Sequence, residues 1–262
     1  PAVIRQAART FAGAERAMIF WGMGISQHVH GTDNARCLIA LALMCGQVGR
    51  PGTGLHPLRG QNNVQGASDA GLIPMFYPDY KSVEAIEQID RYRRFWDHEL
   101  ATHKGLTVVE ITDAMAAGTI KGLYIMGENP AMSDPDQGHT RAALARLEHL
   151  VVQDLFLTET AAFADVVLPA SAFPEKDGTF TNTDRRVQRG RQALDPPGEA
   201  RQDWVIIQEL ALRLGLDWDY REVREIFDEM RQVMPSLTGI TWDRLAAEDA
   251  VTYPCADEHS AG

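Results

Sequence analysis

The run Leu58-Arg59-Gly60-Gln61-Asn62-Asn63-Val64-Gln65-Gly66 contains residue types suited to binding a small anion. Arg59 carries a permanent charge on a planar fork that fits a carboxylate or another oxyanion. Gln61 and the two asparagines add amide donors and acceptors without adding charge, and the glycines allow unusual backbone angles. The pattern fits an anion-binding loop, and its composition fits a polar surface loop equally well.

A second glycine-containing turn, Gly22-Met23-Gly24-Ile25-Ser26-Gln27-His28, follows an expected strand and precedes an expected helix. Bare backbone in this position lets a phosphate approach the N–H groups of a helix. Gln27 stands where the dinucleotide fingerprint requires a third glycine, so that fingerprint is absent. A ligand loop and a plain strand–helix turn both remain open.

Polar residues follow two further expected strands. Gly127-Glu128-Asn129-Pro130 comes after residues 122–126, and Gln153-Asp154 closes the strand that begins at residue 150. Ligands bind at the carboxyl edge of a parallel sheet, and an acid directly after a strand suits ribose hydroxyls or the N–H edge of guanine. Asn129 or Asp154 alone also fits a turn former, but two such endings on neighbouring strands favour a ligand site.

Other polar residues fit structural roles on their spacing alone. Residues 174–182, with Asp184-Arg185-Arg186 after them, are expected to form a charged, solvated loop, and Asp203 is expected to be a helix N-cap. His28, His30 and His56 have no carboxylate or cysteine at metal-ligand spacing, so solvated or core histidines are expected and no metal ligand is assigned. The sequence also lacks the usual nucleophile, P-loop and His-Glu-x-x-His patterns.

Periodicity indicates the elements that must position these residues. Helices are expected at residues 3–13, 33–45, 82–100, 110–117, 138–147, 203–214 and 221–234, and strands at 17–21, 122–126, 150–153 and 165–168. This alternation predicts βαβ units, a parallel sheet and therefore an α/β fold. Thr32 or Asp33 is the expected N-cap of the second helix and Gly46 its end, while residues 46–71 are interpreted as a long irregular functional loop.

Composition excludes several classes of protein. The net charge of −11 over 262 residues argues against sequence-independent nucleic-acid binding. The longest apolar run, residues 38–45, is far shorter than the ~20 residues of a membrane span, so no membrane insertion is expected. Three cysteines without a CxxC pair exclude a disulfide framework and the usual iron–sulfur or zinc spacing, and favour a reducing, cytoplasmic compartment. Because the chain starts at Pro1 inside an expected helix, we expect it to be a piece of a larger protein.

Taken together, these motifs resemble the molybdopterin oxidoreductases. The resemblance rests on Gly-Met-Gly-Ile-Ser-Gln-His, Pro-Leu-Arg-Gly-Gln-Asn-Asn-Val-Gln-Gly, Met-Gly-Glu-Asn-Pro, Val-Val-Gln-Asp and Ala-Asp-Val-Val-Leu-Pro, and it runs through essentially all 262 residues. It is strongest to the catalytic (alpha) subunit of molybdenum or tungsten formate dehydrogenases, especially the soluble NAD-linked type. The Arg-Gly-Gln-Asn-Asn-Val-Gln-Gly run is specific to that branch.

The resemblance implies parallel-sheet, Rossmann-like domains of the formate dehydrogenase and DMSO reductase type. Residues 1–58 would be the C-terminal remnant of one molybdopterin-binding domain, and residues 59–262 most of a second one. The cofactor would be molybdenum or tungsten bis-molybdopterin guanine dinucleotide. The cysteine or selenocysteine ligand, its neighbouring histidine and the cysteines of a 4Fe–4S cluster would precede this region, and a β-barrel domain would follow it. The chain alone is therefore expected to be inactive.

Matching the family motifs residue by residue implies roles for twelve positions. The expected cofactor contacts are Gly22, Met23, Gly24 and Gln27 for one guanylate, and Gly127, Asn129, Gln153, Asp154, Lys176 and Asp203 for the other. Arg59 would bind the carboxylate of formate, with Gln61 beside it. Arginine does not titrate here, so its role would be electrostatic orientation of the anion.

The implied reaction is the oxidation of formate to carbon dioxide. Electrons would pass through iron–sulfur clusters to NAD on another subunit, so the expected partners are the remaining domains of this subunit and iron–sulfur or flavin subunits that bind NAD. Two alternatives are a nitrate-reductase-like oxyanion enzyme and a non-catalytic scaffold related to the iron–sulfur subunit of NADH dehydrogenases. The Arg59 and Gln61 loop argues against the first. Met23, Gln27, Asn129, Asp154 and Lys176 argue against the second.

Overall fold

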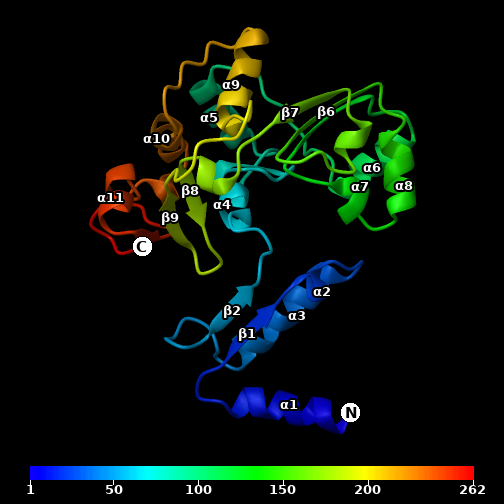
Figure 1. Cartoon of the computed structure of the whole chain (residues 1–262). Helices are drawn as coiled ribbons and strands as arrows, with labels where there is room; N and C mark the ends of the chain where they lie inside the picture. The colour runs from blue at the N-terminus through cyan, green and yellow to red at the C-terminus, as the bar shows by residue number, and fades with distance from the viewer. The chain divides into compact units, whose positions relative to one another are not determined.

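A computed structural model describes all residues from Pro1 to Gly262. The chain forms two compact units: residues 1–65 with 181–186, and residues 66–180 with 187–262. Each unit has its own secondary structure, which Figure 1 shows in chain order. No helix in the chain combines the length and the apolar character needed to cross a lipid bilayer.

The first unit is built around two parallel strands. Its elements are α1 (Ala2–Gly13), β1 (Met18–Trp21), α2 (Met23–Ser26), α3 (Gly31–Met44) and β2 (Gly54–Pro57). Met18 lies opposite Gly54, and Trp21 lies opposite Pro57. The buried amide of Gln47 accepts a hydrogen bond from Ala17 N–H at 2.9 Å and donates one to the Ala14 carbonyl at 2.8 Å. Gln47 thereby ties the end of α3 to the link between α1 and β1.

Helix α3 begins earlier than the sequence predicts. Its N-cap is His30, without a side-chain cap, so the prediction of Thr32 or Asp33 as N-cap is wrong. The reason is the close approach of the preceding turn: a Cβ on Gly31 would lie only 1.8 Å from the Ser26 carbonyl oxygen, so only glycine permits the helix to start there. The predicted end is confirmed, because Gly46 has φ +64° directly after the C-cap.

Residues 46–71 are more regular than predicted. They contain β2 and α4 (Val64–Asp69), so the interpretation of one long irregular loop is wrong. Strand β2 is defined by its parallel pairing with β1, a long-range contact that has no signature in the local sequence. The part that remains a loop is Leu58–Asn63, which holds Arg59 and Gln61.

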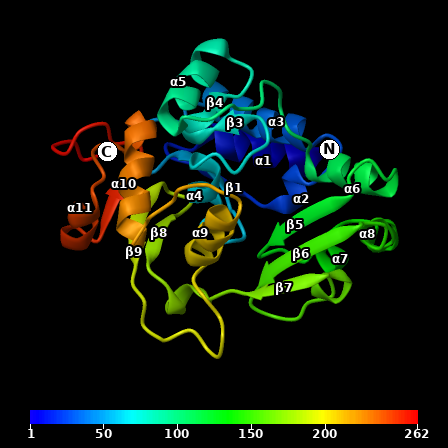
Figure 2. The ribbon, with the colours of Figure 1, turned by 90° about the horizontal axis from the view of Figure 1, so that it is seen from above.

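The second unit contains a three-stranded parallel sheet. Strands β5 (Gly122–Met126), β6 (His149–Asp154) and β7 (Val166–Pro169) lie side by side in that order (Figure 2). Met126 is opposite Gln153, and Asp154 is opposite Pro169. These strands and their parallel direction confirm the predicted α/β fold class.

One face of this sheet is covered by helices. Leu150 and Val152, alternate residues of β6, are at most 1% exposed and belong to a core with residues of α6 (Val108–Ala116), α7 (Pro130–Ser133) and α8 (Gln137–Leu144). Successive strand residues point to opposite faces, so Val151 and Gln153 lie on the other face, with Tyr124 of β5. That second face carries Tyr124 and Gln153, whose polar contacts are described below.

A second core in this unit involves the C-terminal elements. It joins α5 (Ile86–Trp96), α10 (Val223–Val233) and α11 (Trp242–Ala247) to a sheet of β10 (Ala250–Thr252), β9 (Arg186–Gly190) and β8 (Gly178–Thr181), in that order. The prediction of a solvated loop at 174–182 is therefore wrong for residues 178–181, because pairing with a strand further along the chain converts a polar segment into β8. The remaining elements are β3 (Phe76–Tyr77), η1 (Pro78–Tyr80), β4 (Lys81–Ser82), η2 (Ala161–Phe163), η3 (Phe173–Glu175), α9 (Asp203–Arg213) and η4 (Pro235–Leu237).

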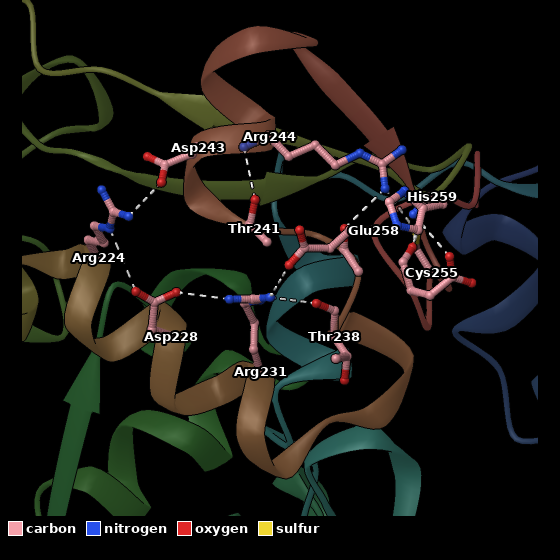
Figure 3. A network of polar contacts seen from close by, with 12 residues as sticks. Arg224, Asp228, Arg231, Thr238, Thr241, Asp243, Arg244, Cys255, Glu258 and His259 are labelled. Carbon is pink, nitrogen blue, oxygen red and sulfur yellow. Dashed lines mark hydrogen bonds and ion pairs between the residues drawn. The ribbon is translucent and has the colours of Figure 1, made fainter.

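Arginine side chains hold the C-terminal segment on this core (Figure 3). Arg231 donates to the Thr238 carbonyl at 2.6 Å and forms an ion pair with Glu258 at 3.6 Å. Arg244, with a side chain only 11% exposed, donates to the Gly239 carbonyl at 3.0 Å and to the Ser260 carbonyl at 2.7 Å. These guanidinium groups satisfy carbonyls that regular secondary structure would otherwise satisfy.

Candidate functional site

Four of the predicted residues, Gly127, Asn129, Gln153 and Asp154, lie together at the carboxyl edge of the β5–β6–β7 sheet. Gly127 N–H donates to the Gln153 carbonyl at 2.9 Å, so the segment leading to Asn129 leaves β5 beside the end of β6. Asp154 ends β6, and its carbonyl accepts from Ala170 N–H at 3.0 Å. Gly127 has φ +64°, a left-handed conformation that favours glycine, and it has open space where a Cβ would stand.

A chain of polar contacts on the second face of the sheet joins three predicted residues. Gln153 is fully buried, and its side-chain nitrogen donates to Asp203 Oδ1 at 2.8 Å. Lys176 forms an ion pair with Asp203 Oδ2. The side chains of Lys176 and Asp203 are 29% and 27% exposed, so this charged pair stays accessible at the sheet edge.

Tyr124 is a fourth member of this network, and the sequence interpretation missed it. Its hydroxyl donates to Gln153 Oε1. Burial raises the pKa of Tyr124, and the negative charge of Asp203 raises it further, so the hydroxyl remains a donor at neutral pH. The available signal was register: Tyr124 lies on the sheet face of Gln153, two residues before the end of β5.

Asp203 does not act as the N-cap predicted from its position. Gln202 is the N-cap of α9, no side chain caps the helix, and Asp203 lies in the first turn. Its carboxylate is instead directed to Gln153 and Lys176. A buried amide and an ammonium group bind a carboxylate more strongly than exposed backbone N–H groups do, which explains the difference.

Asn129 joins two loops at the sheet edge, whereas Asp154 makes a local, turn-forming contact. Asn129 Oδ1 accepts from the Thr160 amide at 3.1 Å and the Thr160 hydroxyl at 2.7 Å. Its amide nitrogen donates to Glu159 at 2.8 Å, and this hydrogen bond lowers the pKa of Glu159. Asp154 Oδ1 accepts from Leu155 N–H at 2.6 Å. Both side chains therefore shape the loops at the sheet edge, and contact with a ligand remains a prediction for each.

In the first unit, the two predicted loops leave the same edge of the β1–β2 pair. Gly22 and the turn α2 follow β1, while Arg59 follows β2, and Leu58 N–H donates to the Trp21 carbonyl at 2.7 Å. Met23 is 55% exposed, and Gly24, Gln27, Arg59 and Gln61 are exposed as well. Parallel pairing thus brings the Gly22–Gln27 turn and the Arg59 loop to one edge.

The three histidines near these loops have different surroundings. His28 and His30 are exposed, and the His28 ring contacts the Gly24 carbonyl at 2.6 Å. His56 is half-buried and stacks on Phe20 with ring centroids 5.1 Å apart. The chain holds no group of three or more His, Cys, Asp or Glu side chains arranged to bind a metal ion.

The donor set at the β5–β6–β7 edge fits a purine nucleotide. A carboxylate such as Asp203 accepts hydrogen bonds from the N–H edge of guanine, and the ammonium group of Lys176 holds that carboxylate through its other oxygen. A separate groove of about 350 Å³ lies between β7 and α9, where Arg201 and Arg213 each form an ion pair with Glu209. The groove contains none of the predicted site residues.

Comparison with known proteins identifies the family. Residues 5–213 match the model of the family described as molybdopterin oxidoreductase. The chain belongs to this family, and the resemblance inferred from its motifs is confirmed.

Several known proteins are similar to this chain in sequence or in structure. The chain is 49% identical over 262 residues to the F420-dependent formate dehydrogenase subunit alpha of Methanocaldococcus jannaschii, covering 99% of this chain and 38% of that protein. It is 40% identical over 259 residues to formate dehydrogenase H of Escherichia coli, covering 98% of this chain and 36% of that protein. Among solved structures, acetylene hydratase from Pelobacter acetylenicus aligns with a TM-score of 0.47 and 24% identity, over 55% of this chain and 20% of its own.

Proposed function

We propose that this chain is part of the catalytic subunit of a formate dehydrogenase, which oxidises formate to carbon dioxide at a molybdenum or tungsten pterin centre. The observation that carries the proposal is the exposed Arg59–Gln61 loop at the carboxyl edge of β1 and β2, in a member of the molybdopterin oxidoreductase family. Two relatives named formate dehydrogenases are similar over 98% or more of this chain and support it.

In this proposal Arg59 binds the substrate. Formate is a small planar carboxylate, and a guanidinium group can donate two parallel hydrogen bonds to it. Gln61 would supply a neutral amide beside that contact. When bound, the metal and its pterins would accept the two electrons, and the proton of the C–H bond, that formate loses as carbon dioxide forms. Arg59 would hold the anion in a fixed orientation and stabilise its charge without exchanging a proton.

The remaining predicted residues would hold the cofactor as a bis-molybdopterin guanine dinucleotide. Gly22, Met23, Gly24 and Gln27 would contact one guanylate, and Gly127, Asn129, Gln153, Asp154, Lys176 and Asp203 the other. The Asp203 carboxylate supports this assignment, because it matches the N–H edge of guanine, and Lys176 would hold the carboxylate in place. Residues 1–58 would then close one pterin-binding domain, and residues 59–262 would form most of the second.

The metal ligand and a 4Fe–4S cluster would lie elsewhere in the same subunit, since this chain spans 38% of its M. jannaschii relative. Partner subunits with iron–sulfur clusters or flavin would carry the electrons to NAD. The name of the M. jannaschii relative specifies F420, so we propose F420 as the alternative acceptor.

The full-length subunit tests the proposal directly. We expect molybdenum or tungsten and pterin near one centre per subunit, together with formate-dependent reduction of a viologen dye. The purified 262-residue chain should reduce no dye, because the metal ligand and cluster would be missing. Formate turnover by the 262-residue chain would contradict the proposal that the metal ligand and the cluster lie elsewhere in the subunit.

The same measurement separates the two alternatives. A full-length subunit without metal or pterin would support a non-catalytic scaffold. A loaded subunit that reduces nitrate and leaves formate unchanged would support an oxyanion reductase. Either result would overturn formate oxidation as the function.

A further inference from the structure

Tyr124, Gln153 and Asp203 form a directed chain of hydrogen bonds. The Tyr124 hydroxyl donates to Gln153 Oε1, and Gln153 Nε2 donates to Asp203 Oδ1 at 2.8 Å. The three residues come from β5, β6 and the first turn of α9. The contacts join the sheet to the start of α9.

The Asp203 carboxylate, which can only accept, selects the amide nitrogen of Gln153, and the Tyr124 hydroxyl holds the amide in that orientation by donating to its oxygen. Rotation of the amide by half a turn would place its oxygen against the Asp203 carboxylate, and both groups are acceptors. Gln153 is fully buried, so water cannot compensate for that repulsion. In the observed orientation the amide oxygen accepts from the Tyr124 hydroxyl and the amide nitrogen donates to the Asp203 carboxylate, so both ends of the amide are hydrogen-bonded.

The fixed amide in turn orients the carboxylate. Gln153 occupies one lone pair on Asp203 Oδ1, and Lys176 occupies one on Oδ2. A carboxylate has about four lone-pair sites, so one remains on each oxygen. The edge of guanine offers two neighbouring N–H donors, and a carboxylate can bind both only when its plane is aligned with the base.

We propose that Tyr124 is a positioning residue: through Gln153 it fixes the Asp203 carboxylate in the orientation that binds the guanine of the pterin dinucleotide. This inference rests on the proposed function, since it assumes that the cofactor carries a guanine nucleotide. Tyr124 need not touch the cofactor itself.

The test compares variants of the full-length, cofactor-loaded subunit. The measurement is the rate at which guanine nucleotide is released on incubation a few degrees below the unfolding transition. Tyr124→Phe removes only the hydroxyl, and we expect release about fivefold faster, the order of effect of one hydrogen bond. Tyr220→Phe is the matched control, because the Tyr220 hydroxyl also donates to a side chain, Glu229, outside this network. Its release rate should equal that of the unmodified subunit.

A double variant shows whether Tyr124 acts through Gln153. Gln153→Met should accelerate release by itself, and adding Tyr124→Phe should then accelerate it no further. If the two substitutions accelerate release independently, so that their factors multiply in the double variant, Tyr124 does not act through Gln153 and the positioning role is overturned. An unchanged release rate in Tyr124→Phe would overturn it as well. A merely structural role would lower the melting temperature of Tyr124→Phe below that of Tyr220→Phe and leave release unchanged. If the unmodified subunit contains pterin without guanine, the nucleotide assignment in the proposed function fails first.

Discussion

The side-chain nitrogen of Gln153 lies 2.8 Å from the carboxylate of Asp203, although fifty residues separate the two in the sequence. This contact joins the end of β6 to the start of α9 and gives the sheet edge a carboxylate with a fixed position. Lys176 completes the arrangement from a third segment. Two of the predicted cofactor contacts in this unit, Gln153 and Lys176, thus bind a third, Asp203.

Asp203→Asn should weaken retention of the nucleotide. The amide keeps the size of the side chain but removes its negative charge, so Lys176 loses its ion pair and a guanine edge loses a charged acceptor. Hydrogen bonds to charged groups contribute more binding free energy than hydrogen bonds between neutral groups. We therefore expect release of guanine nucleotide from the full-length subunit to accelerate about tenfold or more. Asp219→Asn is the control, because Asp219 is 85% exposed and pairs only with Arg221 at 3.8 Å. Equal retention in both variants would remove Asp203 from the site.

Arg59→Lys should impair formate oxidation although it conserves the charge. Lysine lacks the planar fork that binds both oxygens of a carboxylate. Loss of such an anchor in a desolvated site lowers kcat/KM on the order of a hundredfold. Metal and pterin content should not change, since the proposed cofactor contacts lie on other residues.

The exposed Arg36, which pairs with Asp33 at 3.2 Å, offers a matched control. Arg36→Lys should leave the kinetics for formate unaltered. Near-normal kcat/KM in Arg59→Lys would exclude Arg59 from the active site. Loss of cofactor in place of activity would reassign it to a structural role.

Arg244→Ala should destabilise the second unit. The side chain binds two backbone carbonyls and Glu248, and it is only 11% exposed, so its removal leaves polar groups without partners. We expect the free energy of unfolding to fall by about 2–3 kcal/mol, measured by urea denaturation of the full-length subunit. Arg221→Ala, at an 80% exposed position, should change it by less than about 0.5 kcal/mol. Equal stability of the two variants would refute the anchoring role of Arg244.

Gly31→Ala should destabilise the start of α3. The added Cβ would meet the Ser26 carbonyl at 1.8 Å, and backbone atoms cannot move aside as a flexible side chain does. Overpacking of this kind costs about 1–3 kcal/mol. Gly13→Ala is the control, because no atom lies within 4 Å of its Cβ position. Thermal unfolding of both variants measures the difference, and an equal Tm would show that the close approach is absent.

Glu110 makes the stability of α6 depend on pH. Its carboxylate accepts from the Thr107 backbone N–H at 2.7 Å in a capping box, and this hydrogen bond is the main cause of its lowered pKa. A lowered pKa in the folded state means that the contribution is complete above the unfolded pKa and is lost as pH falls through the folded one. Acidification below about pH 4.3 should therefore weaken the helix.

Glu110→Gln should lack this component of the acid-induced loss of stability. The measurement is the unfolding free energy between pH 7 and pH 3, compared with Glu87→Gln. Glu87 also lies in the first turn of a helix, α5, but that helix has no side-chain cap. An identical pH dependence in Glu110→Gln and the unmodified protein would contradict the assignment.

Local sequence is sufficient for the strands of the β5–β6–β7 sheet and for the residues at their ends. Strand β5 coincides with the predicted residues 122–126, because a short apolar run bounded by glycines has few alternatives. The order of residues alone puts Asn129 and Asp154 at one edge, since parallel strands end on the same side. Boundaries are less accurate: α5 begins at Ile86, four residues after the predicted start at 82.

Tertiary structure alone decided what depends on contacts between distant segments. β2 and β8 are strands because other strands pair with them, and such pairing cannot be predicted from a polar or glycine-rich local sequence. Asp203 looks like a helix cap in isolation, and only the approach of Gln153 and Lys176 gives its carboxylate another partner. Tyr124 belongs to the site because its strand pairs with the strand that carries Gln153, which is also a contact between distant segments. Periodicity reports which face a residue occupies, whereas the partner on that face is set by the packing of segments far apart in the chain.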